Sequence, residues 1–127
     1  MNLSEKAEKK RLIGNYVNLG SSHLSDSEVE FLYQFVTQYD RFIGITETIK
    51  SHQDGWSSDG KYTRWKEYTY SFRSDVGIFV EESYHDDDGQ SGRFDQVINN
   101  PREVITWFRS NNHQRSFDSV RDICGLI

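Results

Sequence analysis

A run of acidic residues has the clearest capacity for chemistry in this sequence. The run Asp86–Asp88 precedes Gly89, and carboxylates at alternate positions before a glycine are typical of calcium loops of the EF-hand kind. With Gly89 at the sixth position of such a loop, Asp86 and Asp88 hold the third and fifth. Tyr84 then stands at the first position, where a carboxylate is needed. We therefore interpret the run as a solvated acidic turn, and whether it binds a metal weakly stays open.

The adjacent residues Glu81 and Glu82 raise the alternative of a metal-dependent nuclease, in which carboxylates hold a divalent ion. Neighbouring residues of a strand point to opposite faces, so this pair is poorly placed to chelate one ion. No lysine follows within the next few positions. We expect no metal site here.

Nucleophilic and histidine chemistry finds little support. No serine stands in a G-x-S-x-G elbow, and no stretch matches a phosphate-binding glycine loop or a dinucleotide fingerprint. The histidines lack the i, i+4 spacing of a helix-borne zinc pair, and we expect each of them in an exposed loop: His23, His52, His85 and His113. We predict no catalytic residue and no cofactor, hence a protein that is not an enzyme; an enzyme with a dispersed site is the remaining alternative.

Negative charge is concentrated in one segment. The net charge is −5, and residues 75–95 contain seven carboxylates against a single arginine. Such a cluster attracts a basic partner and disfavours wrong contacts, although ordinary solubility also accounts for it. We predict a partner-binding surface formed by Glu81, Glu82, Tyr84, Asp86, Asp87, Asp88 and Asp95.

The segment Lys61–Arg73 interleaves basic and aromatic residues, a composition shared with platforms that bind single-stranded nucleic acid. The chain as a whole is acidic, and one aromatic face of this segment is needed for the core. We therefore favour a cross-strand aromatic ladder, and we rank nucleic acid below protein as a partner.

The N-terminal region predicts two helices. Ser4 is the expected cap of the first, which ends at Gly20 and has apolar residues at helical spacing: Leu12, Ile13, Tyr16 and Val17. Ser25 and Glu28 have the spacing of a capping box, which predicts a second helix over Asp26–Gln38.

The middle of the chain has a hydrophobic period of two. The expected strands are Ile43–Ile49, Lys61–Phe72 and Val76–Tyr84, and Asp54-Gly55 and Asp59-Gly60 are turn signals between the first two. Within the second strand, Tyr62, Tyr68, Tyr70 and Phe72 share one face. His85–Gly92 is an expected loop, and Arg93–Ile98 fits either an edge strand or a helical turn.

Two more helices are expected at the C-terminus. Asn100, Pro101 and Glu103 have the types that favour the cap, first and third positions of a helix. Ser116 is the expected cap of the last helix, which ends at Gly125. The fold class is therefore α+β: residues 1–127 form a single domain in which an antiparallel three- to four-stranded sheet is packed by N-terminal and C-terminal helices.

Location and partners follow from composition. No run reaches the roughly 18 apolar residues of a membrane helix, the N-terminus lacks a signal-peptide pattern, and Cys124 is the single cysteine, so we expect a cytoplasmic protein without membrane contact. In size and charge the chain resembles bacterial immunity proteins and phage anti-defence proteins. That resemblance implies an inhibitor, for example of the anti-CRISPR kind, that binds a basic protein such as a nuclease or a nucleic-acid-binding complex. The alternative is a self-associating structural or adaptor subunit.

Overall fold

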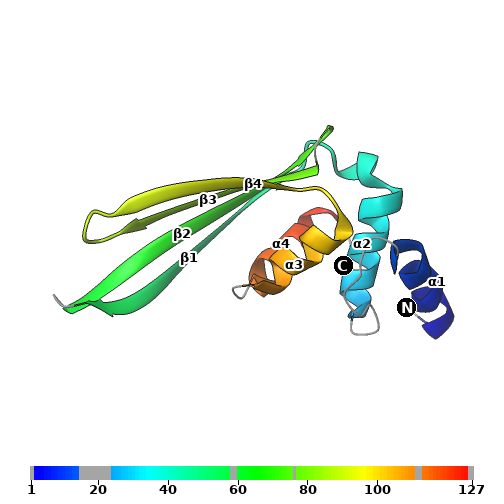
Figure 1. Ribbon diagram of the computed structural model, residues 1–127, viewed down its shortest axis with the longest axis horizontal. Coiled ribbons are helices and arrows are strands. Elements are labelled where there is room, and N and C mark those ends of the chain that lie inside the picture. Colours follow the sequence, from blue (N-terminus) through cyan, green and yellow to red (C-terminus); the bar gives the residue numbers. More distant parts are fainter. Residues whose placement is uncertain (1, 15–23, 58–59, 76, 111–112, 126–127) are drawn as a thin grey trace.

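The computed structural model of the chain describes residues 2–14, 24–57, 60–75, 77–110 and 113–125, and within them it has four α-helices and a four-stranded antiparallel sheet. Helices flank the sheet at both ends of the chain, so the predicted α+β class is confirmed (Figure 1). The helices are α1 (Leu3–Gly14), α2 (Asp26–Thr37), α3 (Pro101–Arg109) and α4 (Gln114–Ile123), and the strands are β1 (Thr46–Ser57), β2 (Gly60–Arg73), β3 (Gly77–Asp86) and β4 (Ser91–Ile98).

The sheet is a meander in the order β1-β2-β3-β4. Its register pairs Tyr70 of β2 with Glu47 and Val80, and Val80 with Gln96. Paired residues of antiparallel strands share a face, so this register defines a helix-facing side and an outer side. Tyr68, Tyr70 and Phe72 are buried on the helix-facing side, as the alternation of β2 predicted.

The core lies under one half of the sheet. Phe31 of α2 is fully buried and makes edge contacts with Phe108 of α3 and Phe117 of α4, at ring-centroid distances of 6.1 and 5.6 Å. One aromatic side chain thus joins three helices that lie beside the sheet (Figure 1). α1 packs on α2, at the end of the molecule farthest from the uncovered half of the sheet (Figure 1).

The other half of the sheet extends well past the helices (Figure 1). We call this part the arm and define it as residues 51–57, 60–66 and 84–94. In the arm the positions of β2 are partly or fully exposed, whereas its second half has buried ones, and the β1-β2 and β3-β4 hairpins extend away from the helices in the same direction (Figure 1). The long strands therefore support a projection that contributes little to the core.

The predicted starts of α2 and α3 are confirmed, and each of these helices has a side-chain cap. Ser25 and Glu28 form the expected capping box of α2, and Asn100 Oδ1 accepts a hydrogen bond from Glu103 N at the start of α3. The prediction for α1 is wrong at its start: Ser4 lies inside the helix, and Asn2 Oδ1 accepts from Glu5 N at 2.8 Å instead. The expected residues Tyr16, Val17 and Gly20 lie outside the described residues.

The start of the first strand and the first turn were placed wrongly. β1 begins at Thr46, after a 3₁₀ turn over Tyr39–Phe42, so the first three residues of the expected Ile43–Ile49 strand precede it and the other four belong to it. Asp54-Gly55 lies within β1 rather than in a turn. Gly55 has a packing role there, because a Cβ on it would stand 2.7 Å from Cζ of Tyr62.

The region between β3 and the C-terminus is more regular than expected. Arg93–Ile98 belongs to β4, an edge strand, which settles the open alternative, and the expected loop His85–Gly92 shortens to a turn at residues 87–90. α4 starts after His113, so Ser116 is not its cap. Ser116 is instead buried inside the first turn of that helix.

Candidate protein-binding surface

The seven residues predicted as a partner-binding surface do not form one surface. Register places Glu81 and Asp95 on the outer side of the sheet, where both pair with Arg93. Glu82 lies on the opposite, helix-facing side, partly buried, and its charge acts on Tyr68. The expectation that these carboxylates are presented together is therefore wrong, because adjacent strand residues point in opposite directions.

Asp86 is bound within the molecule. Its side chain is only 2% exposed and accepts hydrogen bonds from Nε and Nη2 of Arg64, at 2.6 and 3.0 Å. These hydrogen bonds from Arg64 hold the pKa of the Asp86 carboxyl below its usual range. This two-point ion pair ties β3 to β2 at the base of the turn, so Asp86 has a structural role rather than an exposed one.

Asp87 and Asp88 are the exposed members of the acidic run. Oδ2 of Asp87 accepts from Thr63 N at 3.1 Å, and Oδ1 of Asp88 accepts from Gln90 N at 3.2 Å. Among the described residues neither carboxylate forms an ion pair with a lysine or arginine. The tip of the arm therefore retains two negative charges available to a partner.

The helix-facing side of the arm carries a layered aromatic group. Tyr84 lies half-buried beneath Arg64, whose guanidinium carbon is 4.6 Å from the ring centroid, and it stacks against Phe94 at 6.3 Å. Gly92 makes room for this ring, because a Cβ there would stand 2.5 Å from Cε1 of Tyr84. Phe94 is 61% exposed and forms the open end of the group.

The outer side of the arm is aromatic as well. Trp65 stacks on His85 at 5.0 Å, and Trp56, near the tip, is 81% exposed. Large aromatic side chains on a rigid support are the residue type enriched at the energetic centres of protein interfaces. Sequence reasoning missed Trp56 and Phe94, since their exposure depends on how far the sheet extends past the helices.

The histidines differ from the prediction of four exposed loop residues. His52 lies in β1 and His85 in β3, so both are exposed as predicted but in strands rather than loops, while His23 lies outside the described residues. His113 is 4% exposed, stacked on Trp107 at 4.5 Å and in edge contact with Tyr68 at 4.9 Å. Burial lowers the pKa of His113, which favours the neutral ring.

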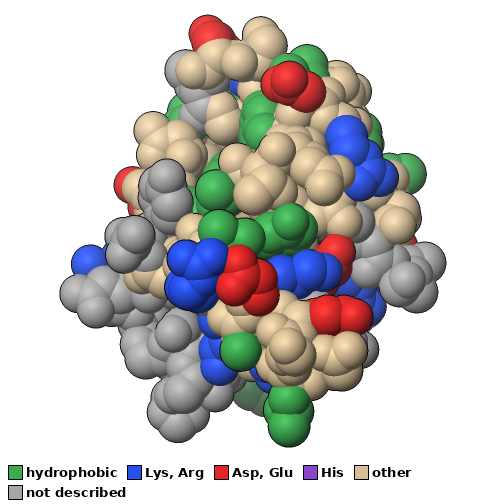
Figure 2. Space-filling view, turned by 90° about the vertical axis from the view of Figure 1, so that its right-hand side faces the viewer, with side chains coloured by type: hydrophobic (Ala, Val, Ile, Leu, Met, Phe, Trp, Pro, Cys, Tyr) green, Lys and Arg blue, Asp and Glu red, His purple; other side chains and the backbone are tan. Residues whose placement is uncertain are grey.

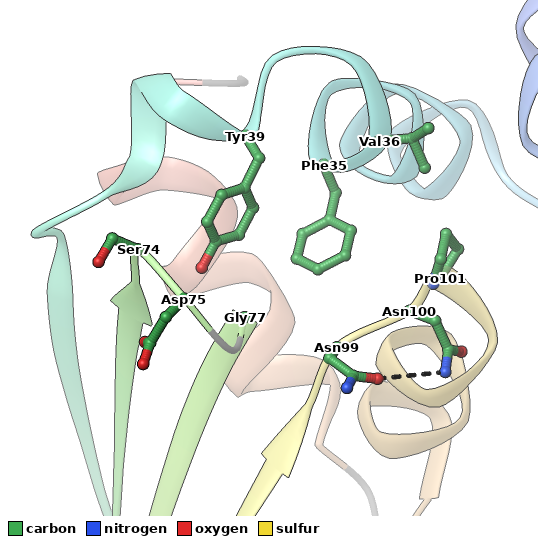
Figure 3. A pocket seen from close by; sticks show the side chains of 9 residues that line it. All are labelled: Phe35, Val36, Tyr39, Ser74, Asp75, Gly77, Asn99, Asn100 and Pro101. Carbon is green, nitrogen blue, oxygen red and sulfur yellow. Dashed lines mark hydrogen bonds between the residues drawn. The ribbon is translucent and has the colours of Figure 1, made fainter.

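A separate pocket of about 520 Å³ opens at the opposite end of the sheet, between α2 and the strand ends (Figure 3). Phe35 and Tyr39 point into it, and Asn99 and Asn100 form its far wall, joined by a hydrogen bond (Figure 3). Asp75 is the one charged residue among the described residues that line it. The pocket thus offers amide and carboxylate groups beside aromatic rings.

Charges at the helical end of the molecule are mixed in sign. Figure 2, which looks at the side where α1 and α2 lie, shows basic and acidic side chains next to one another. Ion pairs between these helices join Lys6 to Asp26 at 2.8 Å and Lys9 to Glu30 at 2.5 Å. This end therefore presents no strong charge of one sign on the face shown.

In the part of the chain that the structure describes, no three His, Cys, Asp or Glu side chains are grouped so as to hold a metal ion. No described helix has the length and apolar character needed to cross a membrane. Comparison of the chain with protein-family profiles, with curated proteins and with solved structures finds no match.

Proposed function

We propose that the protein is a small non-catalytic binding protein that uses the arm to contact and inhibit a nucleic-acid-processing enzyme or complex. The observation that carries this proposal is the projection of the sheet past the helices (Figure 1), together with the exposure of Trp56 and Phe94 on it. A projecting two-faced sheet can enter a groove of a partner, where aromatic side chains become buried.

Charge supports a basic partner. Asp87 and Asp88 stand at the tip of the arm, and the chain as a whole has a net charge of −5. Enzymes that process nucleic acid bind phosphate backbones through lysine and arginine, so their grooves have the complementary charge. The arm combines carboxylates for orientation with aromatic rings for affinity.

Affinity purification of the tagged chain from its native host tests the proposal, with a Trp56→Ser/Phe94→Ser variant beside the unmodified chain. We expect a stoichiometric partner with nuclease or nucleic-acid-binding activity that the chain inhibits and that the variant neither retains nor inhibits. Leu3→Ser/Leu12→Ser is the matched control, since Leu3 and Leu12 are also exposed but lie on α1. Equal retention of the partner by the arm variant and the control would contradict the proposal.

The acidic tip is tested separately. An Asp87→Asn/Asp88→Asn variant should bind the purified partner more weakly and with a smaller dependence on salt, because two screened attractions are removed. Unchanged affinity and unchanged salt dependence would exclude the tip carboxylates from the interface. Asp86 is left intact in this variant because its ion pair with Arg64 is structural.

Self-association is the second candidate function, and one observation favours it. β1 is an edge strand of 12 residues, and an uncovered edge offers backbone groups to another strand. Sedimentation of the purified chain distinguishes the candidates: a concentration-dependent dimer that Lys50→Pro abolishes indicates pairing along β1. A monomer at all concentrations excludes it.

A further inference from the structure

A second hollow, of about 310 Å³, lies at the elbow where the arm meets the start of α4. β1 and β2 form one wall, and the first turn of α4 forms the other. The lining includes Lys66, His113 and Arg115, and none of the carboxylate residues that the structure describes lines it. In an acidic protein, this is a locally cationic enclosure.

The two cations of this hollow have no acidic partner in the described part of the chain. Among the described residues, neither Lys66 nor Arg115 forms an ion pair. Glu82 does not line the hollow, although its charge reaches His113. Among the described residues of the strands, Lys61, Arg64 and Arg93 form ion pairs, whereas Lys50 and Arg73 do not but lie outside the hollow. Lys66 and Arg115 are therefore the charges of this hollow that are available to a ligand.

His113 supplies an independent indication of a ligand. Its side chain is more than nine-tenths buried and forms no hydrogen bond within the described residues. The one fully enclosed side-chain nitrogen or oxygen without a partner, among those described, is Nε of Arg121. The ring nitrogens of His113 are therefore not sealed in the core, and the open space that this residue lines is the hollow.

The N-terminus of α4 adds to the positive potential of the hollow. α4 has ten residues, starts after His113, and has neither a side-chain cap nor an acidic residue in its first turn. Backbone N–H groups at a helix start carry partial positive charge and favour anions. Ser116, in that turn, also lines the hollow.

We propose that Lys66, His113 and Arg115 form a binding site for a small phosphate monoester. A phosphate monoester carries a charge of about −1.5 to −2 near neutral pH, which two unpaired cations balance, and its three terminal oxygens accept the available donors. The hollow is at the lower end of the size of small-molecule sites, roughly 300 to 1,000 Å³. The polar lining residues Ser51 and Gln53 suit a sugar-like remainder of the ligand.

Titration of the full chain with ribose 5-phosphate, followed by NMR of the His113 ring, tests the site. We expect saturable shifts of that ring with ribose 5-phosphate, smaller ones with inorganic phosphate, and none with ribose. A Lys66→Gln/Arg115→Gln variant should bind at least tenfold more weakly, because charge-assisted hydrogen bonds are lost. Lys50→Gln/Arg102→Gln removes the same charge elsewhere and should bind as the unmodified chain does.

Thermal unfolding of both variants establishes that each is folded. The proposal is overturned if the His113 ring gives no saturable response to either phosphate, if ribose alone produces the same response, or if the two variants bind equally. The titration needs no protein partner, so the phosphate site and the proposed inhibitory function can fail independently.

Discussion

Arg64 and Asp86 face one another across β2 and β3, joined by two hydrogen bonds, and the same guanidinium covers the ring of Tyr84. One arginine thus fixes both the base of the acidic turn and the aromatic group of the arm. Asp86, which the sequence predicts to be part of a partner-binding surface, instead determines the shape of the arm.

Replacing Asp86 with Asn should destabilise the chain, since it leaves the Arg64 charge without a carboxylate. Asp88→Asn, in the exposed turn, should change the free energy of unfolding by less than about 0.5 kcal/mol. Urea unfolding of the two variants checks this.

The contribution of Asp86 should also depend on pH. Because the pKa of Asp86 is lowered below its ordinary 3.8, the stability that it contributes is present above that pH and is lost as pH falls through the lowered value. In the Asp86→Asn variant the free energy of unfolding should lack this acid-dependent contribution.

Gly92→Ala should destabilise by about 1 to 3 kcal/mol, because the added Cβ meets the ring of Tyr84 at 2.5 Å. Gly14→Ala is the matched control: no atom of the described residues lies within 4 Å of a Cβ there, and Gly14 is the last residue of α1, so stability should change by less than about 1 kcal/mol. Chemical denaturation of both variants gives the comparison. Equal stability of the two would show that the Tyr84 ring moves aside without cost.

Acidification should weaken the fold through His113. Burial lowers its folded-state pKa below the ordinary 6.5, so both states are neutral above that pH and only the unfolded state gains a proton just below it. Stability should therefore decline as pH falls from 6.5 toward the folded-state pKa. His113→Phe should flatten this part of the profile, measured by urea unfolding between pH 7 and 5; a slope that survives the substitution would assign it to other groups.

Cys124 should be inert in the folded chain. The thiol is 7% exposed and burial raises its pKa to about 12, so little thiolate forms near pH 8. We expect a thiol-specific reagent to label it at least about 100-fold more slowly in buffer than in urea. Rapid labelling without denaturant would show that the end of α4 opens readily.

Local signals in the sequence were sufficient for part of the fold. The cap of α2 depends on Ser25 and Glu28, three residues apart, and the alternation of β2 depends on adjacent positions, so both could be predicted without tertiary information. The role of Gly55 could not be predicted in this way. A glycine fits a turn and a close contact with a ring equally well, and only the register, which places Gly55 opposite Tyr62, distinguishes the two roles.

The candidate site was harder to predict than the fold. Asp86 and its arginine are 22 positions apart, and their pairing depends on which residues β2 and β3 align. The number of charges along the chain does not distinguish the seven carboxylates of residues 75–95 from one another. In the fold, strand direction and ion pairs leave two of them, Asp87 and Asp88, exposed at the tip. The burial of His113 could not be predicted because it depends on contacts with two other elements, Trp107 of the preceding helix and Tyr68 of the distant strand β2.

The meander joins only sequential strands, so the arm can open from its tip by separating hairpins while the buried half of the sheet stays intact. Local opening of this kind needs less free energy than unfolding the whole chain. Amide hydrogen exchange along β2 should therefore slow progressively from the Gly60 end to the Arg73 end. With protection graded in this way, the tip of the arm can adjust its shape to a partner while the base of the arm keeps its shape.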